Sequence, residues 1–254
     1  MLYYLWNKWQ RPNMYSFNGF MNVLKRVIGK LLHFFLKCFS SIYANRGEVL
    51  MIHWVCNDRL DNPNEKFRLS TEQFESLIDW LKVKNVIRLE NWESESDFYA
   101  LTVDDVPECF YFNAYPILVK EKIPFTLFVN VSLLDTVGYI TSEQLKEMSS
   151  NTLCTIGSHG IEHVEYARLS CAEVLNELHN SKDILERKVG KSVQMFAFPY
   201  GSYYACGYKN KVLAGEIYKY AFGTVASPIT QPTFFKQYFL PRINVDADFI
   251  KSMQ

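Results

Sequence analysis

The feature that most constrains the fold is an alternation of strand-like and helix-like segments that runs from residue 46 towards the end of the chain. Short apolar runs, such as residues 48–55 and 124–131, alternate with helical patterns long enough to connect parallel strands. This alternation predicts a parallel sheet with helices outside it, either open or closed into a barrel. Roughly six to eight strands are expected, which approaches the eight of a complete (β/α) barrel.

Several of the expected helices carry start and stop signals. Ser70 and Ser170 each stand three residues before a Gln or Glu, which is the spacing of a capping box. Gly190 supplies a C-terminal stop for the helix that Ser170 begins. Pro116 lies inside another helical pattern and predicts a kink or an interrupted start there, because proline lacks the backbone N–H that a helix interior needs.

Residues 22–42 carry a separate amphipathic pattern. At about 100° per residue, large apolar side chains share one face and basic side chains share the opposite face. The uncharged stretch is far shorter than the ~20 residues of a membrane span, whereas a basic amphipathic helix suits a membrane interface. The alternative is an ordinary helix packed on its own domain. We expect an N-terminal arm with this helix in residues 1–45 and an α/β barrel in residues 46–254.

Composition narrows the partners and the compartment. Lys+Arg and Asp+Glu are balanced at 27 each, so net charge gives no case for nucleic-acid binding. Six cysteines are scattered without C-x-x-C spacing, which is typical of reduced thiols in an intracellular protein. The first residues lack the positive-then-apolar order of a secretory signal. We therefore expect a cytoplasmic protein, with residues 22–42 offering contact with the inner membrane face.

A pair of carboxylates ends one of the expected strands. Tyr99, Leu101 and Val103 alternate with other residues, and Asp104 and Asp105 follow directly. The carboxyl ends of strands are where α/β folds place their chemistry. Two like charges that lie close together are costly unless a cation lies between them or one is protonated. The alternative is a solvated turn, for which Asp is also favoured.

Two histidines follow a later strand end. His159 and His163 are four residues apart, and on one helical turn that spacing would place both imidazoles on the same side. Two His and one carboxylate form a set with open coordination positions, typical of a catalytic divalent metal site. The alternative is a helix start with water-exposed rings. Glu162, between the two histidines, is expected to face solvent.

The order of these motifs resembles the polysaccharide deacetylase family, carbohydrate esterase family 4. Residues 102–106 (TVDDV) are similar to the family's T-F-D-D-G, residues 159–163 (HGIEH) to H-[ST]-x-x-H, and residues 197–201 (AFPYG) to R-x-P-Y-G. The likeness extends from Val49 to Arg242. It implies a distorted (β/α)7-type barrel and the removal of N-acetyl groups from a saccharide or lipid-linked polysaccharide precursor.

The resemblance also implies roles for individual residues. Asp105, His159 and His163 would bind a divalent metal, with zinc expected. Asp104 would be the general base, and the backbone N–H of Tyr200 would stabilise the oxyanion. The remaining substrate-binding residues that we expect are Pro199, Arg242 and His53, with Tyr200 contributing here too.

The chain departs from the family pattern at three places. Val106 replaces the motif glycine, so we expect a different path for this loop, fixed by Pro107. Ala197 stands where the family has an arginine that orients the base. There is no L-x-H near the end to supply a general acid, and Arg242 is a poor proton donor. His53 is one candidate for the acid, and the alternative is a buried histidine bonded to backbone.

Four tyrosines follow the third motif: Tyr200, Tyr203, Tyr204 and Tyr208. They would stack on sugar rings or pack in the interior, and the sequence does not separate the two.

Three functions remain open. The first is a metal-dependent N-deacetylase of glycans. The second is a catalytically weakened carbohydrate-binding barrel that keeps the metal site, for which the missing arginine and histidine argue. The third is an amidase acting on a non-sugar substrate with the same metal.

Overall fold

The computed structural model describes residues 44–58, 63–231 and 238–253. The compact unit described here begins at Ala44. The expected amphipathic helix at residues 22–42 lies outside the described residues, and the division expected after residue 45 stays a prediction. No helix within the described ranges is both long and apolar enough to cross a membrane.

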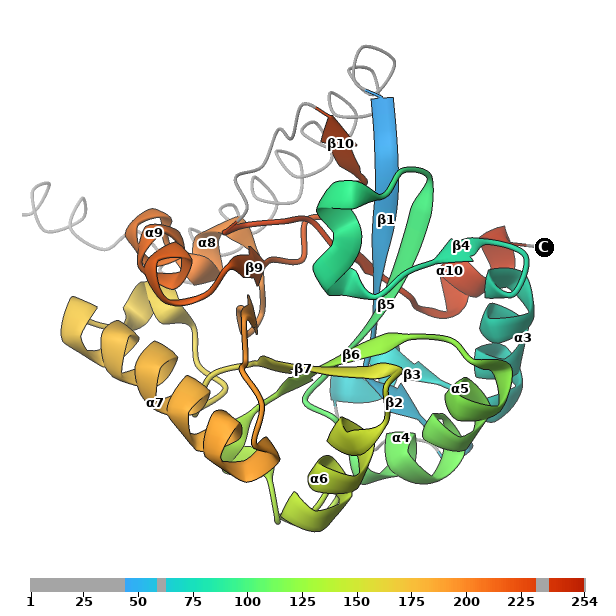
Figure 1. Ribbon diagram of the computed structural model, residues 1–254, viewed down its shortest axis with the longest axis horizontal. Helices are drawn as coiled ribbons and strands as arrows, with labels where there is room; N and C mark the ends of the chain where they lie inside the picture. The colour runs from blue at the N-terminus through green and yellow to red at the C-terminus, as the bar shows by residue number, and fades with distance from the viewer. Residues whose placement is uncertain (1–43, 59–62, 232–237, 254) are drawn as a thin grey trace, which may run out of the picture. The chain divides into compact units, whose positions relative to one another are not determined.

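Most strands belong to one curved, largely parallel sheet (Figure 1). Its edge strand is antiparallel to its neighbour, two short strands pair beside the main path, and two further strands form a small separate sheet. In order across the main sheet, the strands are β10 (Ile229–Gln231), β1 (Ala44–Ile52), β5 (Phe98–Asp104), β6 (Phe125–Val129), β7 (Cys154–Ser158), β8 (Met195–Ala197) and β9 (Tyr220–Phe222). The others are β2 (Trp54–Val55), β3 (Arg68–Leu69), β4 (Asn85–Val86) and β11 (Ile243–Asn244).

The segment around β11 connects the two edges of the parallel strands. Leu240 forms a parallel bridge with Phe222 at the end of β9. A few residues later β11 pairs with β1, and the Val245 N–H donates to the Met51 carbonyl at 2.9 Å. Six parallel strands and this segment therefore form a ring of seven. The predicted distorted (β/α)7-type barrel is confirmed for the described unit.

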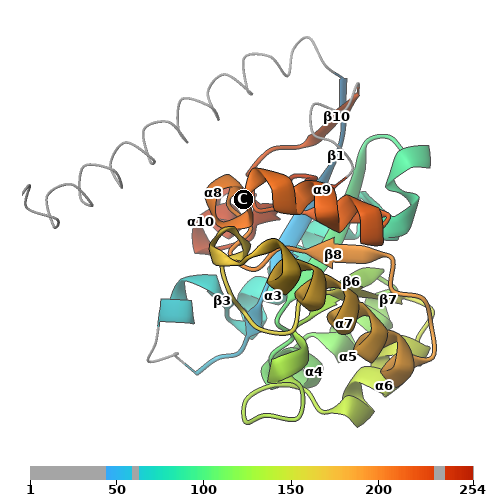
Figure 2. The ribbon, with the colours of Figure 1, turned by 90° about the vertical axis from the view of Figure 1, so that its left-hand side faces the viewer.

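Helices surround the strands on the outside, as Figures 1 and 2 show from two directions. Six of them are α3 (Thr71–Leu81), α4 (Glu108–Asn113), α5 (Tyr115–Glu121), α6 (Ser142–Ser150), α7 (Cys171–Val189) and α9 (Tyr208–Ile217). Two more are α8 (Tyr203–Cys206) beside α9 and α10 (Ala247–Ser252) beside α3. The 3-10 segments are η1 (Pro63–Phe67), η2 (Leu89–Ser94), η3 (Val131–Leu133) and η4 (Tyr166–Arg168).

The local signals of the sequence act as predicted. Ser70 and Ser170 both form complete capping boxes at the starts of α3 and α7, and Gly190 ends α7 in the left-handed conformation. The pattern around Pro116 is interrupted at Ala114, so that α4 and α5 are separate helices with the proline in the first turn of α5.

Both faces of the central strands are buried, which explains their nearly continuous apolar sequences. Because successive side chains point to opposite faces, Leu50, Leu101 and Leu127 pack in the larger cluster with the helices. Their neighbours Val49 and Phe128 pack in a second cluster on the other face. The chemistry is therefore confined to the strand ends and the loops that follow them.

Candidate active site

The turn after β5 directs two carboxylates to one place. Asp104 is the last residue of the strand, and Asp105 and Val106 have φ values of 60° and 50°. These left-handed conformations cost non-glycine residues roughly 1–2 kcal/mol and are often found at functional sites. His159 Nε2 lies 3.9 Å from Asp104 Oδ2 and 3.8 Å from Asp105 Oδ1. Both acids thus face the same imidazole, as predicted.

The backbone conformation of Val106 differs from the one expected for this turn. A different backbone path was expected because valine replaces the motif glycine. Instead, Val106 adopts the left-handed region that glycine favours, with its side chain fully buried. Its N–H donates to the Asp104 carbonyl at 2.7 Å, and burial of the apolar side chain offsets the backbone cost.

The two histidines do not lie on a helical turn, so that prediction was wrong. They lie in the irregular loop between β7 and η4. The loop carbonyls of Gly160 and Ile161 accept hydrogen bonds from the N–H groups of η3, at 3.1 and 3.0 Å, and are not used within the loop. Gly160 has a φ of 84°, and a Cβ there would lie 2.8 Å from the Tyr166 hydroxyl. The loop brings His159 and His163 together by its tertiary contacts.

A buried glutamate of α7 holds this loop. Glu177 is 8% exposed, and its Oε2 accepts the Ile161 N–H at 2.7 Å and the Glu162 N–H at 3.2 Å. The Tyr166 hydroxyl donates to the same oxygen at 3.4 Å. Glu177 is not among the residues predicted from the sequence. The available signal was its position on the buried face of α7, near Val174 and Leu178, where a carboxylate needs donors.

Hydrogen bonding sets the tautomer of His159. Its Nδ1 lies 2.7 Å from the Ala197 carbonyl oxygen. Because a carbonyl can only accept, Nδ1 carries the proton and Nε2 presents its lone pair towards the two acids. Burial lowers the pKa of both His159 and His163, partly opposed by Asp104. Both rings are therefore held in the neutral form that binds metals.

The donor set fits a divalent cation. The ligand atoms of Asp105, His159 and His163 all lie within 4.8 Å of one another, and His163 Nε2 is 3.9 Å from Asp105 Oδ2. Two ligands that each lie about 2.0–2.2 Å from one tetrahedral zinc ion are roughly 3.3–3.6 Å apart, so the separations of 3.8 and 3.9 Å from Asp105 to the two rings need to close by only a few tenths of an ångström. Asp105 Oδ1 is buried and has no hydrogen-bond partner among the described residues. A cation at this point would satisfy it.

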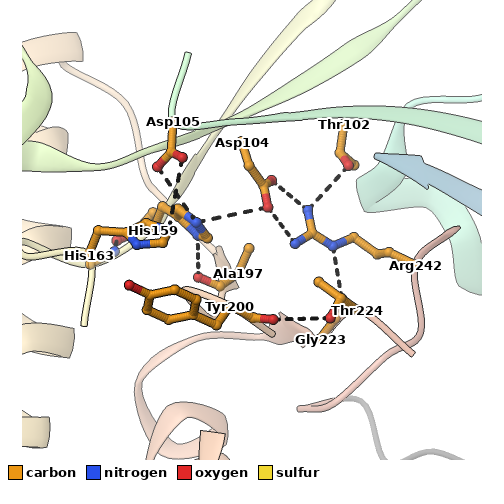
Figure 3. Close-up of polar contacts among 12 residues, drawn as sticks. Thr102, Asp104, Asp105, His159, His163, Ala197, Tyr200, Gly223, Thr224 and Arg242 are labelled. Atoms are coloured by element: carbon orange, nitrogen blue, oxygen red, sulfur yellow. Dashed lines mark hydrogen bonds and ion pairs between the residues drawn. The ribbon is translucent and has the colours of Figure 1, made fainter. Parts of the chain in front are cut away.

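Arg242 forms a bidentate ion pair with the other acid, Asp104 (Figure 3). Its Nη1 and Nη2 donate to Asp104 Oδ1 and Oδ2 at 2.6 and 2.7 Å, and both side chains are buried. Two further N–H groups are used as well, with Nε bonded to the Gly223 carbonyl at 3.0 Å and Nη1 also near Thr102 Oγ1 at 3.3 Å. The prediction that Arg242 binds substrate is therefore corrected: it positions Asp104, in place of the arginine that was expected at Ala197.

The pKa values of the two neighbouring carboxyl groups are shifted in opposite directions. Burial raises the pKa of Asp104, but the charge and hydrogen bonds of Arg242, together with His159, outweigh it and lower the pKa to about 2. Burial raises the pKa of Asp105 to about 6. The electrostatic interaction with His159 opposes this rise, and the negative charge of Asp104 adds to it. Asp104 thus stays a carboxylate at neutral pH, whereas Asp105 gains most from a cation.

The third motif forms a tight turn beside the histidines. Tyr200 and Gly201 have φ values of 60° and 53°, and a Cβ at Gly201 would lie 2.3 Å from Thr224 Cγ2. The Tyr200 ring meets the His163 ring at 4.6 Å between centroids. The backbone N–H of Tyr200 donates to no other backbone group among the described residues, which leaves it available to a ligand.

Pro199 is buried, and its substrate contact stays a prediction. Glu162 is exposed, as expected.

His53 lies between β1 and β2, at the same end of the barrel. Its ring stacks on Phe67 at 4.8 Å, and its Nδ1 is buried without a partner among the described residues. Burial lowers its pKa to about 4, although Asp104 opposes the shift. The alternative of a backbone-bonded histidine is not supported at Nδ1. An orphan ring nitrogen near the acids suggests a ligand that uses it.

Comparison with known proteins agrees with this geometry. The model of the polysaccharide deacetylase family matches residues 93–213. A poly-β-1,6-N-acetyl-D-glucosamine N-deacetylase of Staphylococcus aureus is 29% identical over 206 residues, which cover 72% of this chain and 70% of the relative.

Two solved structures share the fold. A polysaccharide deacetylase from Bacillus cereus superposes with a TM-score of 0.72 at 21% identity, covering 82% of this chain and 68% of that one. The Streptococcus pyogenes deacetylase PplD, solved in complex with acetate, gives a TM-score of 0.70 at 21% identity, with 82% and 97% covered.

Proposed function

The chain carries a polysaccharide deacetylase domain, matched by that family over residues 93–213, and we propose that it hydrolyses the N-acetyl amide of an N-acetylated polysaccharide. The products are acetate and a free amine on the sugar. The observation that carries this proposal is the pairing of Asp104, fixed by Arg242, with the adjacent donor set of Asp105, His159 and His163. One acid is held as a base while the other is free to bind a cation.

The relatives suggest a polymer of N-acetylglucosamine as the substrate class, since the Staphylococcus aureus enzyme is named for poly-β-1,6-N-acetyl-D-glucosamine. A lipid-linked saccharide is the finer form of the same proposal. The basic amphipathic pattern of residues 22–42 supports a position at the cytoplasmic membrane surface. Co-sedimentation of the full chain with anionic vesicles checks that placement, and a chain that stays in solution would exclude it.

The residues divide the work of amide hydrolysis. Asp105, His159 and His163 would hold a divalent cation, for which we propose zinc, and its chemistry there would be to polarise the amide carbonyl and to lower the pKa of water. Asp104 accepts the proton of the attacking water, and Arg242 keeps both of its oxygens in place. The Tyr200 N–H donates to the carbonyl oxygen as negative charge develops on it.

The leaving amine needs a proton, and we propose that His53 delivers it. Its partly buried ring is close enough to Asp104 for the two groups to shift each other's pKa. With a pKa of about 4 it is neutral at neutral pH. It must therefore take up a proton from solvent before it passes one to the nitrogen, and Asp104 returns the proton of the attacking water to solvent as acetate leaves.

The structure weakens one alternative. A carbohydrate-binding barrel without turnover was supported by the missing motif arginine, but Arg242 supplies a guanidinium to Asp104 from the segment just before β11. An amidase acting on a non-sugar substrate would use the same residues, and substrate comparison separates it from a glycan deacetylase.

Acetate release from β-1,6-linked N-acetylglucosamine oligomers tests the proposal. We expect Asp104→Asn to lower kcat by at least about hundredfold, because a general base contributes on that order, while zinc content stays near that of the wild type. His163→Ala should lose zinc as well as activity. The matched control is Asp248→Asn, at an exposed acid of α10, which should leave kcat and zinc content unchanged.

Bound zinc without acetate from any N-acetylated sugar would exclude the function. Glycan binding that survives in an otherwise inactive wild type would favour the binding barrel.

A further inference from the structure

The tyrosines that follow the third motif lie on the surface. Tyr203, Tyr204 and Tyr208 are 52%, 55% and 68% exposed, and Tyr200 is 55% exposed. The reason is the short helix α8, which buries Ala205 and Cys206 and leaves its two tyrosines outside. Interior packing, the alternative that the sequence left open, is therefore excluded. We call Tyr203, Tyr204 and Tyr208 the tyrosine surface.

The first ring of this surface is fixed from beneath by a lysine. Lys211 is 4% exposed, and its Nζ lies 3.1 Å from the centre of the Tyr203 ring and 4.1 Å from that of Phe239. Nζ has no hydrogen-bond acceptor among the described residues. Burying an ammonium in this way is costly, and the two cation–π contacts offset part of the cost.

Further ring contacts keep Tyr203 in place. It lies edge-on to Tyr204 at 6.1 Å and to Phe239 at 5.9 Å between centroids. A ring held by three neighbours loses little freedom when a ligand packs on its open side, which favours binding.

The tyrosine surface follows directly in the chain after Tyr200, which lies in the active site. Tyr200 contacts the His163 ring at 4.6 Å (Figure 3), and α8 starts only three residues later in the chain. Among residues 200–210 the only exposed charged side chain is Lys209, and the exposed Arg168 of the adjacent η4 is paired with Glu165 at 2.6 Å. Phenol rings with so few unpaired charges beside them suit a neutral ligand that has apolar faces and a hydroxyl rim, because tyrosine itself combines an apolar ring with a polar end. Pyranose rings have this chemistry.

We propose that the tyrosine surface binds the sugar residues next to the one being deacetylated, so that the enzyme selects chains over short oligosaccharides. This inference rests on the proposed deacetylase function. An anionic membrane is the less suitable partner, because electrostatic attachment needs several exposed basic side chains.

The test compares a hexamer and a dimer of β-1,6-linked N-acetylglucosamine as substrates of the full chain loaded with zinc. In the wild type, kcat/KM should be higher for the hexamer. The double variant Tyr203→Ala/Tyr204→Ala should lose about tenfold in kcat/KM on the hexamer, mainly through KM, since two lost aromatic contacts are worth that order. Its kcat/KM on the dimer should stay unchanged. The control Phe112→Ala removes an equally exposed ring, 61% exposed, from α4 and should change neither.

A second measurement separates this inference from the proposed function. Hexamer binding to the metal-free protein, followed by calorimetry, does not depend on turnover and should weaken in the double variant alone. Binding that depends on the tyrosines without acetate release would refute the deacetylase function and keep the surface. Acetate release with the same hexamer preference in wild type and double variant would refute the surface. Loss of binding to anionic phosphatidylglycerol vesicles, with hexamer kinetics unchanged, would reassign the tyrosines to a membrane and also refute it.

Discussion

Two adjacent carboxyl groups of this protein behave oppositely because their neighbours differ. Asp104 is paired with the guanidinium of Arg242 and stays ionised. Asp105 has a buried oxygen without a partner among the described residues, and its pKa is raised to about 6. His53 belongs to the same cluster of charges, and burial keeps it neutral. At the scale of single residues, desolvation and the nearest charge decide which form each group takes.

His53 makes the stability of the metal-free protein depend on pH. Its folded pKa of about 4 lies below the ordinary value of 6.5, so the unfolded chain binds more protons between these values. Stability should therefore fall as the pH drops from about 6.5 to 4, by at most about 3 kcal/mol because the ring is only partly buried.

Urea unfolding of the wild type and of His53→Gln, at neutral pH and near pH 4, measures this contribution by difference. The variant should lose less stability on acidification than the wild type. His179→Gln, at an exposed position of α7, is the control with the same side-chain change. An identical pH dependence in the wild type and His53→Gln would contradict the prediction.

At the scale of elements, helix α7 organises the loop that carries both histidines. Its capping box and its glycine stop define a long, stable helix, and Glu177 projects from its buried face onto the loop N–H groups. The loop, which is not helical itself, takes its conformation from this contact and from the bonds to η3. The spacing of the histidines therefore has a tertiary cause.

We predict that Glu177→Ala lowers zinc affinity by about 10- to 100-fold, the usual effect of removing a group that supports metal ligands. Competition with a chromophoric chelator measures it without reference to activity. Glu177→Gln keeps one acceptor oxygen and should recover part of the affinity. Asp183→Ala, on the exposed side of the same helix, should bind zinc as the wild type does. A lower unfolding temperature with unchanged zinc affinity would mean that Glu177 only stabilises the fold.

At the scale of the whole molecule, closing the barrel completes the catalytic site. Arg242 lies 138 residues beyond Asp104 in the chain and reaches it because residues 240–245 bridge β9 and β1. The guanidinium is carried by residues 240–245, whereas the family motif has its arginine at the position of Ala197. A site assembled in this way depends on the complete ring of strands.

Replacing Arg242 separates its charge from its geometry. Arg242→Lys keeps a positive charge but loses the two parallel hydrogen bonds, so kcat should fall and the pKa of Asp104 should rise from about 2. The acidic limb of the kcat profile should therefore move to higher pH. Arg242→Met leaves a buried carboxylate unpaired and should cost about 3–5 kcal/mol of stability. Kinetics across pH and urea unfolding measure these effects, and an acidic limb that does not move in Arg242→Lys would show that Arg242 does not tune the base.

The sequence by itself determined the features that depend on neighbours along the chain. The capping boxes at Ser70 and Ser170, the interruption near Pro116 and the strand that ends in Asp104 were all predicted, because each has a local cause. The alternation of strands and helices was sufficient for a parallel sheet, since parallel strands need crossovers of this length, whereas the closed seven-stranded barrel was implied only by the resemblance to the family. The metal-binding residue types were also evident from their positions after strand ends.

Only the tertiary structure decided how distant residues share a site. The guanidinium on Asp104, the clamp of Glu177 on the histidine loop and the left-handed turn at Val106 depend on contacts between segments that are remote in sequence. The outward direction of the tyrosines depends on which side of α8 meets the barrel. Local patterns carry no information on such contacts, because their free energy comes from burial and charge in the assembled interior.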